Sequence, residues 1–264
     1  MLSIREYVFA ESVEEACALV RKSPANRIIG GGCWLRLERR PYGTLVDISR
    51  LGLDQIEEAD GFFRIGGCCT LRQLERSALL RSRFGSLFAE CTAGIVGVQF
   101  RNCATLGGSL YGRFGFSDLA TALLALEAEV DLCQAGRLSL EDFLKTFRHG
   151  ERDVLTAVRI PADARASFAS FRLTATDLPV LNAAVGRRLG RWRIAVGARP
   201  AVAALAPKAA EQLAAGTPLA AETAARELRF GSNLRGSAQY RAALCQVLVE
   251  RCIQAQKEEM SCGS

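Results

Sequence analysis

The stretch Arg101-Asn102-Cys103-Ala104-Thr105-Leu106-Gly107-Gly108-Ser109-Leu110 decides how the 264-residue chain is interpreted. A second glycine cluster, Ile28-Ile29-Gly30-Gly31-Gly32-Cys33-Trp34-Leu35, lies earlier and directly follows a short apolar run. Glycine has no Cβ and tolerates positive φ, so backbone N–H groups in such clusters can closely approach a phosphate. Neither segment has the Gly-x-Gly-x-x-Gly or Walker spacing, so the sequence does not favour a Rossmann or P-loop domain. Both segments are nevertheless candidate binding sites for a diphosphate.

A carboxylate follows the second segment at a fixed distance. Asp118 stands nine residues after Ser109 and, with Ser117, opens an apolar helix predicted over residues 119–126. A carboxylate near a diphosphate site can accept hydrogen bonds from ribose or ribityl hydroxyls. Taken singly, each glycine pair indicates an ordinary turn more than a binding site, and Asp118 can cap the helix and bind a cofactor at the same time. The order and spacing of the whole set favour a cofactor site.

Residue patterns predict a chain of mixed helices and strands. Capping boxes predict helices after Ser12 and Thr70, and an apolar stripe predicts another after Ser237. Small residues dominate the segment 91–110, where we expect no helix. A domain boundary is expected near residues 161–166. Strands are predicted at residues 27–29, 44–48, 62–65, 129–132, 153–160, 168–173, 181–185 and 192–196.

Composition excludes several classes of protein. The net charge is +6, but the basic residues are scattered and no nucleic-acid-binding module accompanies them, so we expect no nucleic-acid partner. The ten cysteines include no Cys-x-x-Cys pair, which argues against a metal site or an iron–sulfur cluster in this chain. No signal peptide and no apolar run of about 20 residues is present, so we expect a cytoplasmic protein without membrane contact.

The glycine segments and the helix of Asp118 together resemble the FAD-binding subunit of the molybdopterin hydroxylases, the group of xanthine dehydrogenase and carbon monoxide dehydrogenase. Residues 30–35 match that family's Ala-Gly-Gly-Thr-Asp-Leu segment, and residues 100–110 match its Ile-Arg-Asn-x-Ala-Thr-x-Gly-Gly-Asn-Leu segment. Residues 117–126 match the helix that follows, and residues 234–241 resemble the signature of the small C-terminal domain. The likeness covers nearly the whole chain.

The resemblance implies an α+β fold in two parts. An FAD-binding domain of the vanillyl-alcohol-oxidase (PCMH) type would occupy residues 1–161, with subdomains at about 1–55 and 56–161. A small α+β C-terminal domain of antiparallel strands and helices, like that of the carbon monoxide dehydrogenase flavoprotein, would occupy residues 162–264. FAD would lie between the two subdomains.

The resemblance also implies the cofactor-binding residues. The two glycine segments would hold the diphosphate and adjacent groups, Asp118 would bind a cofactor hydroxyl, and Ile95 and Leu155 would pack on the cofactor. Arg172 falls where relatives place a lysine near the flavin. No catalytic residue and no metal ligand is expected in this chain. The expected site comprises Ile28, Ile29, Gly30, Gly31, Gly32, Cys33, Trp34, Leu35, Ile95, Thr105, Gly107, Gly108, Ser109, Asp118, Leu155 and Arg172.

Departures from the family pattern leave alternatives open at single residues. Cys33-Trp34 replaces the usual Thr-Asp, and Ser109 replaces the commoner Asn. Trp34 is then either a cofactor contact or a core or interface residue, and Arg172 is either a flavin contact or a surface cation on a strand. Cys33, with Cys68 and Cys69, is expected to be an inert buried thiol.

The resemblance implies an electron-transfer role that needs partner chains. A molybdopterin-binding large subunit would oxidise the substrate, and a small subunit with 2Fe-2S clusters would relay electrons to FAD, which would pass them to NAD or another acceptor. The compact size most resembles the FAD subunits of xanthine (purine) dehydrogenases. Two alternatives are a self-sufficient flavin oxidoreductase of the same fold and a flavin-free scaffold subunit, which the Cys33-Trp34 departure suggests.

Overall fold

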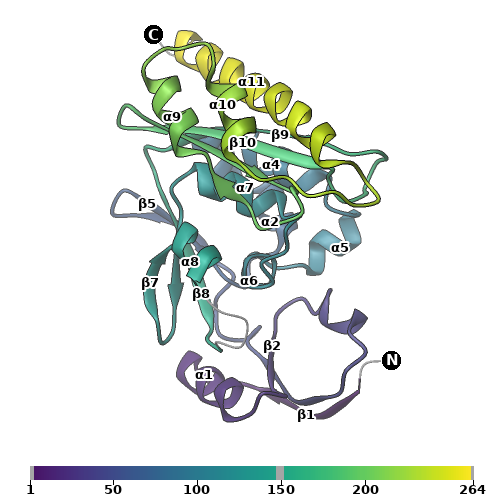
Figure 1. Cartoon of the computed structure of the whole chain (residues 1–264). Coiled ribbons are helices and arrows are strands. Elements are labelled where there is room, and N and C mark those ends of the chain that lie inside the picture. Colours follow the sequence, from purple (N-terminus) through teal and green to yellow (C-terminus); the bar gives the residue numbers. More distant parts are fainter. Residues whose placement is uncertain (1–2, 147–151, 263–264) are drawn as a thin grey trace.

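The computed structural model describes residues 3–146 and 152–262, and its three sheets follow one another along the molecule (Figure 1). The first sheet is parallel, in the order β1-β3-β2, and helix α1 connects β1 to β2. Both of these strands run parallel to β3, which lies between them, and parallel strands need a crossover connection of this kind. The elements of this first region are β1 (Ile4–Phe9), α1 (Val13–Lys22), β2 (Arg27–Ile29), the short 3-10 helix η1 (Leu35–Leu37) and β3 (Tyr42–Asp47).

Helix α1 begins where the sequence predicts. The Ser12 hydroxyl accepts the backbone N–H of Glu15 at 3.0 Å. The Glu15 carboxylate accepts the N–H of Glu11, one residue earlier than a standard capping box would place it. Strand β1, which precedes this helix, was not predicted.

The second sheet is antiparallel, in the order β4-β5-β8-β6-β7. It lies in the middle of the molecule, beside a group of short helices (Figure 1). Its strands are β4 (Ile56–Ala59), β5 (Phe62–Gly66), β6 (Glu129–Leu132), β7 (Gly136–Ser139) and β8 (Leu155–Pro161). The helices are α2 (Leu71–Arg76), α3 (Ala78–Phe84), α4 (Leu87–Ala93), α5 (Val98–Cys103), α6 (Leu106–Tyr111), α7 (Asp118–Ala125) and α8 (Leu140–Thr146).

The prediction that residues 91–110 contain no helix is wrong. Helix α4 extends into this segment, and α5 and α6 lie within it. Short helices of this kind are marginal by themselves and form because packing fixes them. In α6 the side chains of Leu106 and Leu110 are fully buried, and the Thr105 hydroxyl caps the first turn. Residues 105–110 are therefore the start of a helix and not an open loop.

The third sheet is antiparallel, in the order β12-β11-β10-β9, and helices cover both of its faces. Helices α10 and α11 lie at the C-terminal end of the molecule, while α4 and α7 contact the sheet from the side of the second sheet (Figure 1). The elements are β9 (Arg165–Phe171), β10 (Leu181–Arg188), β11 (Arg191–Gly197), β12 (Ala204–Leu205), α9 (Pro207–Ala214), α10 (Ala220–Glu227) and α11 (Ala238–Cys262).

A buried arginine fixes the start of α11. Arg241 is only 1% exposed, and its guanidinium donates to the carbonyl oxygens of Val180, Gly231 and Gly236 and to the side chain of Asn233. Burial lowers the pKa of Arg241. The chain from Gly231 to Gly236, just before α11, is therefore held by hydrogen bonds to one cation.

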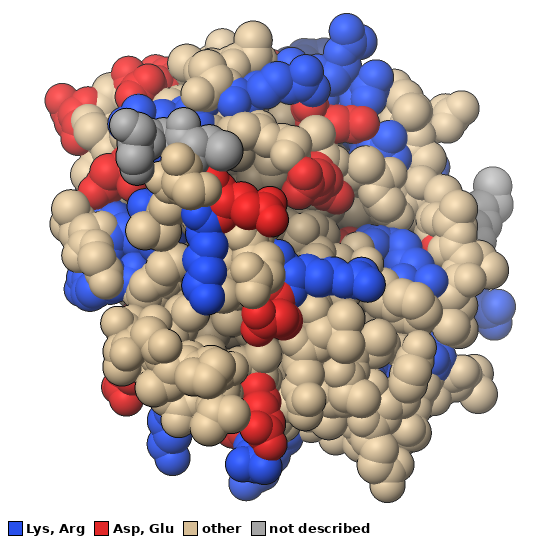
Figure 2. Space-filling model, turned by 90° about the horizontal axis from the view of Figure 1, so that it is seen from above, with Lys and Arg blue, Asp and Glu red and all other residues tan. Residues whose placement is uncertain are grey.

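The mixed helix and strand content confirms the predicted α+β class. One hydrophobic core includes residues of the second sheet and α7 together with Ala184 and Ala195 of the third sheet, so buried packing is continuous across residues 161 and 162. The division of the chain at that point stays a prediction. No helix in the described ranges is both long and apolar enough to cross a bilayer. On the face around the C-terminal helices, Lys and Arg are interspersed with Asp and Glu (Figure 2).

Candidate cofactor-binding site

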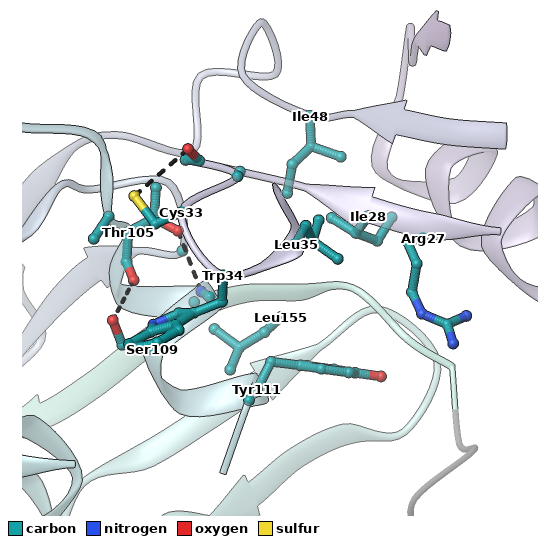
Figure 3. Close-up of a pocket in the computed structure, with 18 of the residues that line it drawn as sticks. Arg27, Ile28, Cys33, Trp34, Leu35, Ile48, Thr105, Ser109, Tyr111 and Leu155 are labelled. Carbon is teal, nitrogen blue, oxygen red and sulfur yellow. Dashed lines mark hydrogen bonds between the residues drawn. The ribbon is translucent and has the colours of Figure 1, made fainter. Parts of the chain in front are cut away.

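A cavity of about 540 Å³ lies between the first and second sheets. The first sheet contributes Arg27, Ile28 and the glycine segment that follows β2, and the second contributes Gly67, Leu155 and the start of α6. Arg27 lies at one end of the labelled side chains, and Thr105, Ser109 and Trp34 lie toward the other end (Figure 3). The two glycine segments, far apart in sequence, therefore line one space.

The two glycine segments touch each other directly. A Cβ on Gly31 would lie 1.6 Å from the carbonyl oxygen of Cys103, so no other residue fits there without separating the segments. A Cβ on Gly30 would lie 2.8 Å from the Thr105 hydroxyl. Glycine is required here for the approach of one backbone to another.

Unpaired backbone donors are concentrated in the first segment. Among the described residues, the backbone N–H groups of residues 31–35 make no hydrogen bond. Gly32 has a φ of +65°, and a left-handed residue within such a run turns successive N–H groups toward one anion. This segment therefore forms a candidate anion site.

The second segment offers fewer donors than its glycines suggest. The N–H groups of Leu106 and Gly107 donate to the carbonyl oxygens of Cys69 and Gly67, and that of Gly108 donates to the Thr105 hydroxyl. The N–H of Ser109 donates to the Thr105 carbonyl oxygen. The cause is α6, since the first turn of a helix uses its caps and neighbours to satisfy these groups. The expectation that both segments offer open backbone donors is met by the first one only.

Positive charge surrounds the cavity. Arg27, Arg40, Arg113 and Arg152 line it, against the carboxylates of Glu38 and Asp153. Burial lowers the pKa of Arg27, and the nearby guanidinium groups of Arg40 and Arg152 lower it further. The Arg152 Nε is buried without a hydrogen-bond partner in the described part of the chain. Clustered cations, one of them with an unsatisfied donor, suit an anionic ligand such as a diphosphate.

One wall of the cavity is apolar. It consists of the side chains of Ile28, Leu35 and Ile48, together with Leu155 and the ring of Tyr111 (Figure 3). The Tyr111 hydroxyl accepts the backbone N–H of Asp153 at 2.9 Å, which fixes the ring, and burial raises the pKa of Tyr111 to about 12. An apolar wall beside a cationic rim suits a dinucleotide, which combines flat rings with phosphates.

A second, much smaller space adjoins the cavity. It measures about 50 Å³, and its lining includes Ile95, Asp118 and Arg172. Asp118 is 2% exposed and forms an ion pair with Arg172 through one carboxylate oxygen, while the other accepts the Asn182 side chain at 2.8 Å. Burial raises the pKa of Asp118 to about 6, although the Arg172 guanidinium acts in the opposite direction.

The sequence left two interpretations of Arg172, and its side chain is not a surface cation. It is 14% exposed and bonded to Asp118, Ser170 and the backbone of Asp177.

Trp34 stands between the two spaces and lines both. Its indole ring lies 5.8 Å from the ring of Phe100, 5.1 Å from that of Phe114 and 5.7 Å from that of Phe116, measured between centroids. Phe114 and Phe116 stack on each other at 5.2 Å. The tryptophan that departs from the family pattern is thus part of an aromatic cluster.

The structure brings together nearly all of the expected site residues. Ile29 lines neither space and instead packs toward Gly32. Trp34 and Ser109 line both spaces, whereas Ile95, Asp118 and Arg172 line only the smaller one. The large cavity is lined by Ile28, Gly30, Gly31, Gly32, Cys33, Trp34, Leu35, Thr105, Gly107, Gly108, Ser109 and Leu155.

Several lining residues were not expected from the sequence. The arginines are dispersed along the chain, and only the fold gathers them. Tyr111 had a usable signal, because it directly follows the second glycine segment on the same short helix. The unexpected residues include Arg27, Arg40, Arg113, Arg152, Tyr111 and Phe114.

The three cysteines expected to be inert are buried. Burial raises the pKa of the Cys33 thiol, raises that of Cys68 to about 12 and raises that of Cys69 to about 11. The predicted burial is confirmed. A thiol with a raised pKa is a poor nucleophile at neutral pH, which agrees with an inert role, and that role stays a prediction.

Known proteins resemble the chain over nearly its whole length. The nicotine 6-hydroxylase medium subunit of Paenarthrobacter nicotinovorans is 28% identical over 94% of this chain and 95% of its own. A putative xanthine dehydrogenase FAD-binding subunit of Escherichia coli K12 is 26% identical over 96% of each chain.

Solved structures share the fold as well. A carbon monoxide dehydrogenase chain from Hydrogenophaga pseudoflava matches with a TM-score of 0.84 at 25% identity, over 97% of this chain and 98% of its own. A chain of quinoline 2-oxidoreductase from Pseudomonas putida 86 matches with a TM-score of 0.81 at 26% identity, over 97% and 96%. These matches confirm the PCMH-type fold. Residues 2–163 match the family model described as the FAD binding domain in molybdopterin dehydrogenase. The chain therefore belongs to the FAD-binding subunits of the molybdopterin hydroxylase family.

Proposed function

We propose that the chain holds one FAD in the cavity between the two glycine segments and transfers electrons within a molybdenum-dependent complex. The observation that carries this proposal is the run of backbone N–H groups at residues 31–35 that make no hydrogen bond to a described residue. These residues line the same cavity as four arginines. A diphosphate is the part of FAD that needs such donors. The apolar wall of Leu155 and Tyr111 suits a flat ring.

Each part of the site has a separate task. The first glycine segment and the arginines bind the diphosphate, and the second segment positions the first through the contact of Cys103 with Gly31. Asp118 accepts a cofactor hydroxyl through its buried carboxylate. Bound FAD supplies the redox chemistry, and the protein holds it and tunes its potential.

The electron path follows from the family. We propose that a molybdopterin-binding large subunit oxidises the substrate and that a small subunit with 2Fe-2S clusters delivers the electrons to this chain. NAD is the proposed acceptor, and the substrate is a purine of the xanthine type, as the named similarity to a putative xanthine dehydrogenase subunit suggests. A cytoplasmic location accompanies this role.

The test of FAD binding uses the charge of the cavity rim. Arg152→Glu places a carboxylate beside the diphosphate. It is expected to weaken FAD binding at least about tenfold, because one charge-assisted hydrogen bond, worth about 1.5–3 kcal/mol, is lost. Arg191→Glu is the matched control, because Arg191 is 69% exposed and distant from the cavity lining. Equal FAD affinity in the two variants, measured by titration of the flavin-free protein, would contradict the placement.

The complete complex tests the remaining parts. Co-expression with the two partner chains, followed by assays with xanthine and NAD, is expected to give NAD reduction that depends on all three chains. Substrate oxidation by this chain alone would favour a self-sufficient flavin oxidoreductase. A folded complex that takes up no FAD would favour a scaffold subunit.

A further inference from the structure

A cluster of two thiols and one carboxylate lies where helix α1 meets the second sheet (Figure 1). Cys17 comes from α1, Cys133 follows β6, and Asp153 precedes β8. The ligand atoms of these three side chains all lie within 4.8 Å of one another. Cys17 and Asp153 are 136 positions apart in the sequence, so no local spacing of metal ligands marks the cluster.

The separations within the cluster suit a zinc ion. Tetrahedral zinc, bonded at about 2.3 Å to sulfur and about 2.1 Å to oxygen, holds a sulfur ligand about 3.6 Å from an oxygen ligand. The Cys17 Sγ atom lies 3.6 Å from the Asp153 Oδ1 atom. Two sulfur ligands of zinc lie about 3.8 Å apart, and the Sγ atoms of Cys17 and Cys133 are already within 4.8 Å. A small rotation of the partly buried Cys133 side chain completes the arrangement.

Asp153 is a buried carboxylate that forms no ion pair with a described residue. It is 5% exposed, and its oxygens accept the backbone N–H groups of Gln134, Ala135 and Val154 at 2.7–3.1 Å. These hydrogen bonds fix the orientation of the carboxylate, but none of the donors carries a full positive charge. Buried charges in proteins are paired or coordinate a metal. The Oδ1 atom also accepts the Cys17 thiol, in the direction where a metal shared by the two side chains would lie.

We propose that Cys17, Cys133 and Asp153 bind one zinc ion, which joins α1 to the second sheet. Zinc replaces the two thiol protons, which are released to the solvent, and the thiolates and the carboxylate fill three of its four positions. A water fills the fourth position from the side of Cys133, the one partly exposed member of the three. Thiolate ligands select zinc over magnesium and calcium, which take oxygen ligands.

The zinc site adjoins the large cavity. Asp153 lines that cavity, and its backbone N–H donates to the hydroxyl of Tyr111, whose ring belongs to the apolar wall. Val20, which follows Cys17 on α1, lines the same cavity. A zinc ion held by Cys17 and Asp153 therefore ties together two elements that border the cavity. The site goes beyond the proposed function and does not depend on it.

Titration of the purified full chain with cobalt(II), after removal of metal by a chelator, tests the site. Tetrahedral cobalt bound to thiolates absorbs visible light, so difference spectra report binding to the cysteines directly. We expect these bands to saturate at one cobalt per chain and to disappear when zinc is added. Loss of an outer-shell partner of a metal lowers its affinity about 10–100-fold, so Cys133→Ser, which removes a ligand, should lower it at least about a hundredfold.

Two further variants complete the test. Asp153→Asn keeps the shape of the side chain without its charge and should also weaken cobalt binding, which covers the case in which Cys133→Ser does not fold. Cys103→Ser is the control, because the Cys103 thiol is exposed and lies outside the cluster.

Three results would overturn the zinc site. The first is a cobalt titration of the unmodified chain without thiolate bands. The second is unchanged affinity in folded Cys133→Ser and Asp153→Asn. The third is a loss in Cys103→Ser as large as in Cys133→Ser, because cobalt would then bind accessible thiols adventitiously. The titration needs no added FAD, so its failure is distinct from failure of the proposed function.

Discussion

Substitution of Gly31 by alanine tests whether the two glycine segments are one structural unit. The added Cβ would lie 1.6 Å from the Cys103 carbonyl oxygen and 2.4 Å from its carbonyl carbon, and both are backbone atoms that no rotamer change can move. Ordinary contacts are 3.4 Å or longer, so the segments must separate by well over 1 Å. Forced overpacking of this kind costs about 1–3 kcal/mol of folding free energy.

The effect on FAD binding is expected to be larger than on stability. A site works only when its groups stay within about 0.5 Å of their productive positions, and the displaced segment carries the unpaired N–H groups. Loss of one or two charge-assisted hydrogen bonds, at about 1.5–3 kcal/mol each, lowers affinity by about tenfold to a thousandfold or more.

The assay combines urea unfolding with titration of FAD into the flavin-free protein. Gly30→Ala meets the movable Thr105 hydroxyl at 2.8 Å and should have an intermediate effect. Gly97→Ala meets only the end of the Gln99 side chain at 3.3 Å and should change FAD binding little. Gly31→Ala with the stability and FAD affinity of the unmodified protein would refute the contact between the segments.

Three further predictions concern the C-terminal helix, the titration of Asp118 and the cysteines. Arg241→Met leaves four acceptors without their donor, the buried Val180 carbonyl oxygen among them, and should cost about 2–5 kcal/mol in urea unfolding. Exposed Arg251→Met on the same helix should stay within about 0.5 kcal/mol, and equal losses would contradict the anchoring role. Burial raises the pKa of Asp118 to about 6, so protonation below that pH removes the acceptor for a ligand hydroxyl, and FAD affinity should fall by up to about tenfold per pH unit below 6. Asp118→Asn should bind weakly and independently of pH between 5 and 8, and a pH profile like that of the unmodified protein would exclude Asp118 as the titrating group. Iodoacetamide at pH 7.5 should label exposed Cys103 well before Cys252, whose pKa burial raises to about 12; mass spectrometry that shows the reverse order would contradict the described burial.

Local capping signals predicted helix starts well. Ser12, Thr70 and Ser117 each cap the helix expected after them, because their hydroxyls accept N–H groups three residues on. Strand β1 was missed because its side chains are largely exposed along one edge of the sheet, so no buried periodicity marks it. Helices α5 and α6 were missed because glycine and small residues lower helix propensity, and tertiary packing overrides that preference.

The sequence predicted the two glycine segments of the candidate site but not the arginines that surround it. Gly31 and Thr105 were expected to share a site because both lie in segments that match motifs of the family that the sequence resembles. The four arginines come from separate segments, and only the fold brings Arg27 and Arg152 to one rim. The burial of Arg172 against Asp118 depends on the third sheet meeting α7, a contact with no local sequence signal.

The central claim is that one FAD occupies the cavity beside Gly31 to Leu35. The most direct measurement is the visible spectrum of the purified complex of this chain with its partners, with the released flavin identified and counted. We expect the flavin bands and about one FAD per chain, together with loss of flavin in a folded Gly31→Ala complex. A folded complex that contains no flavin and takes up none from added FAD would contradict the account.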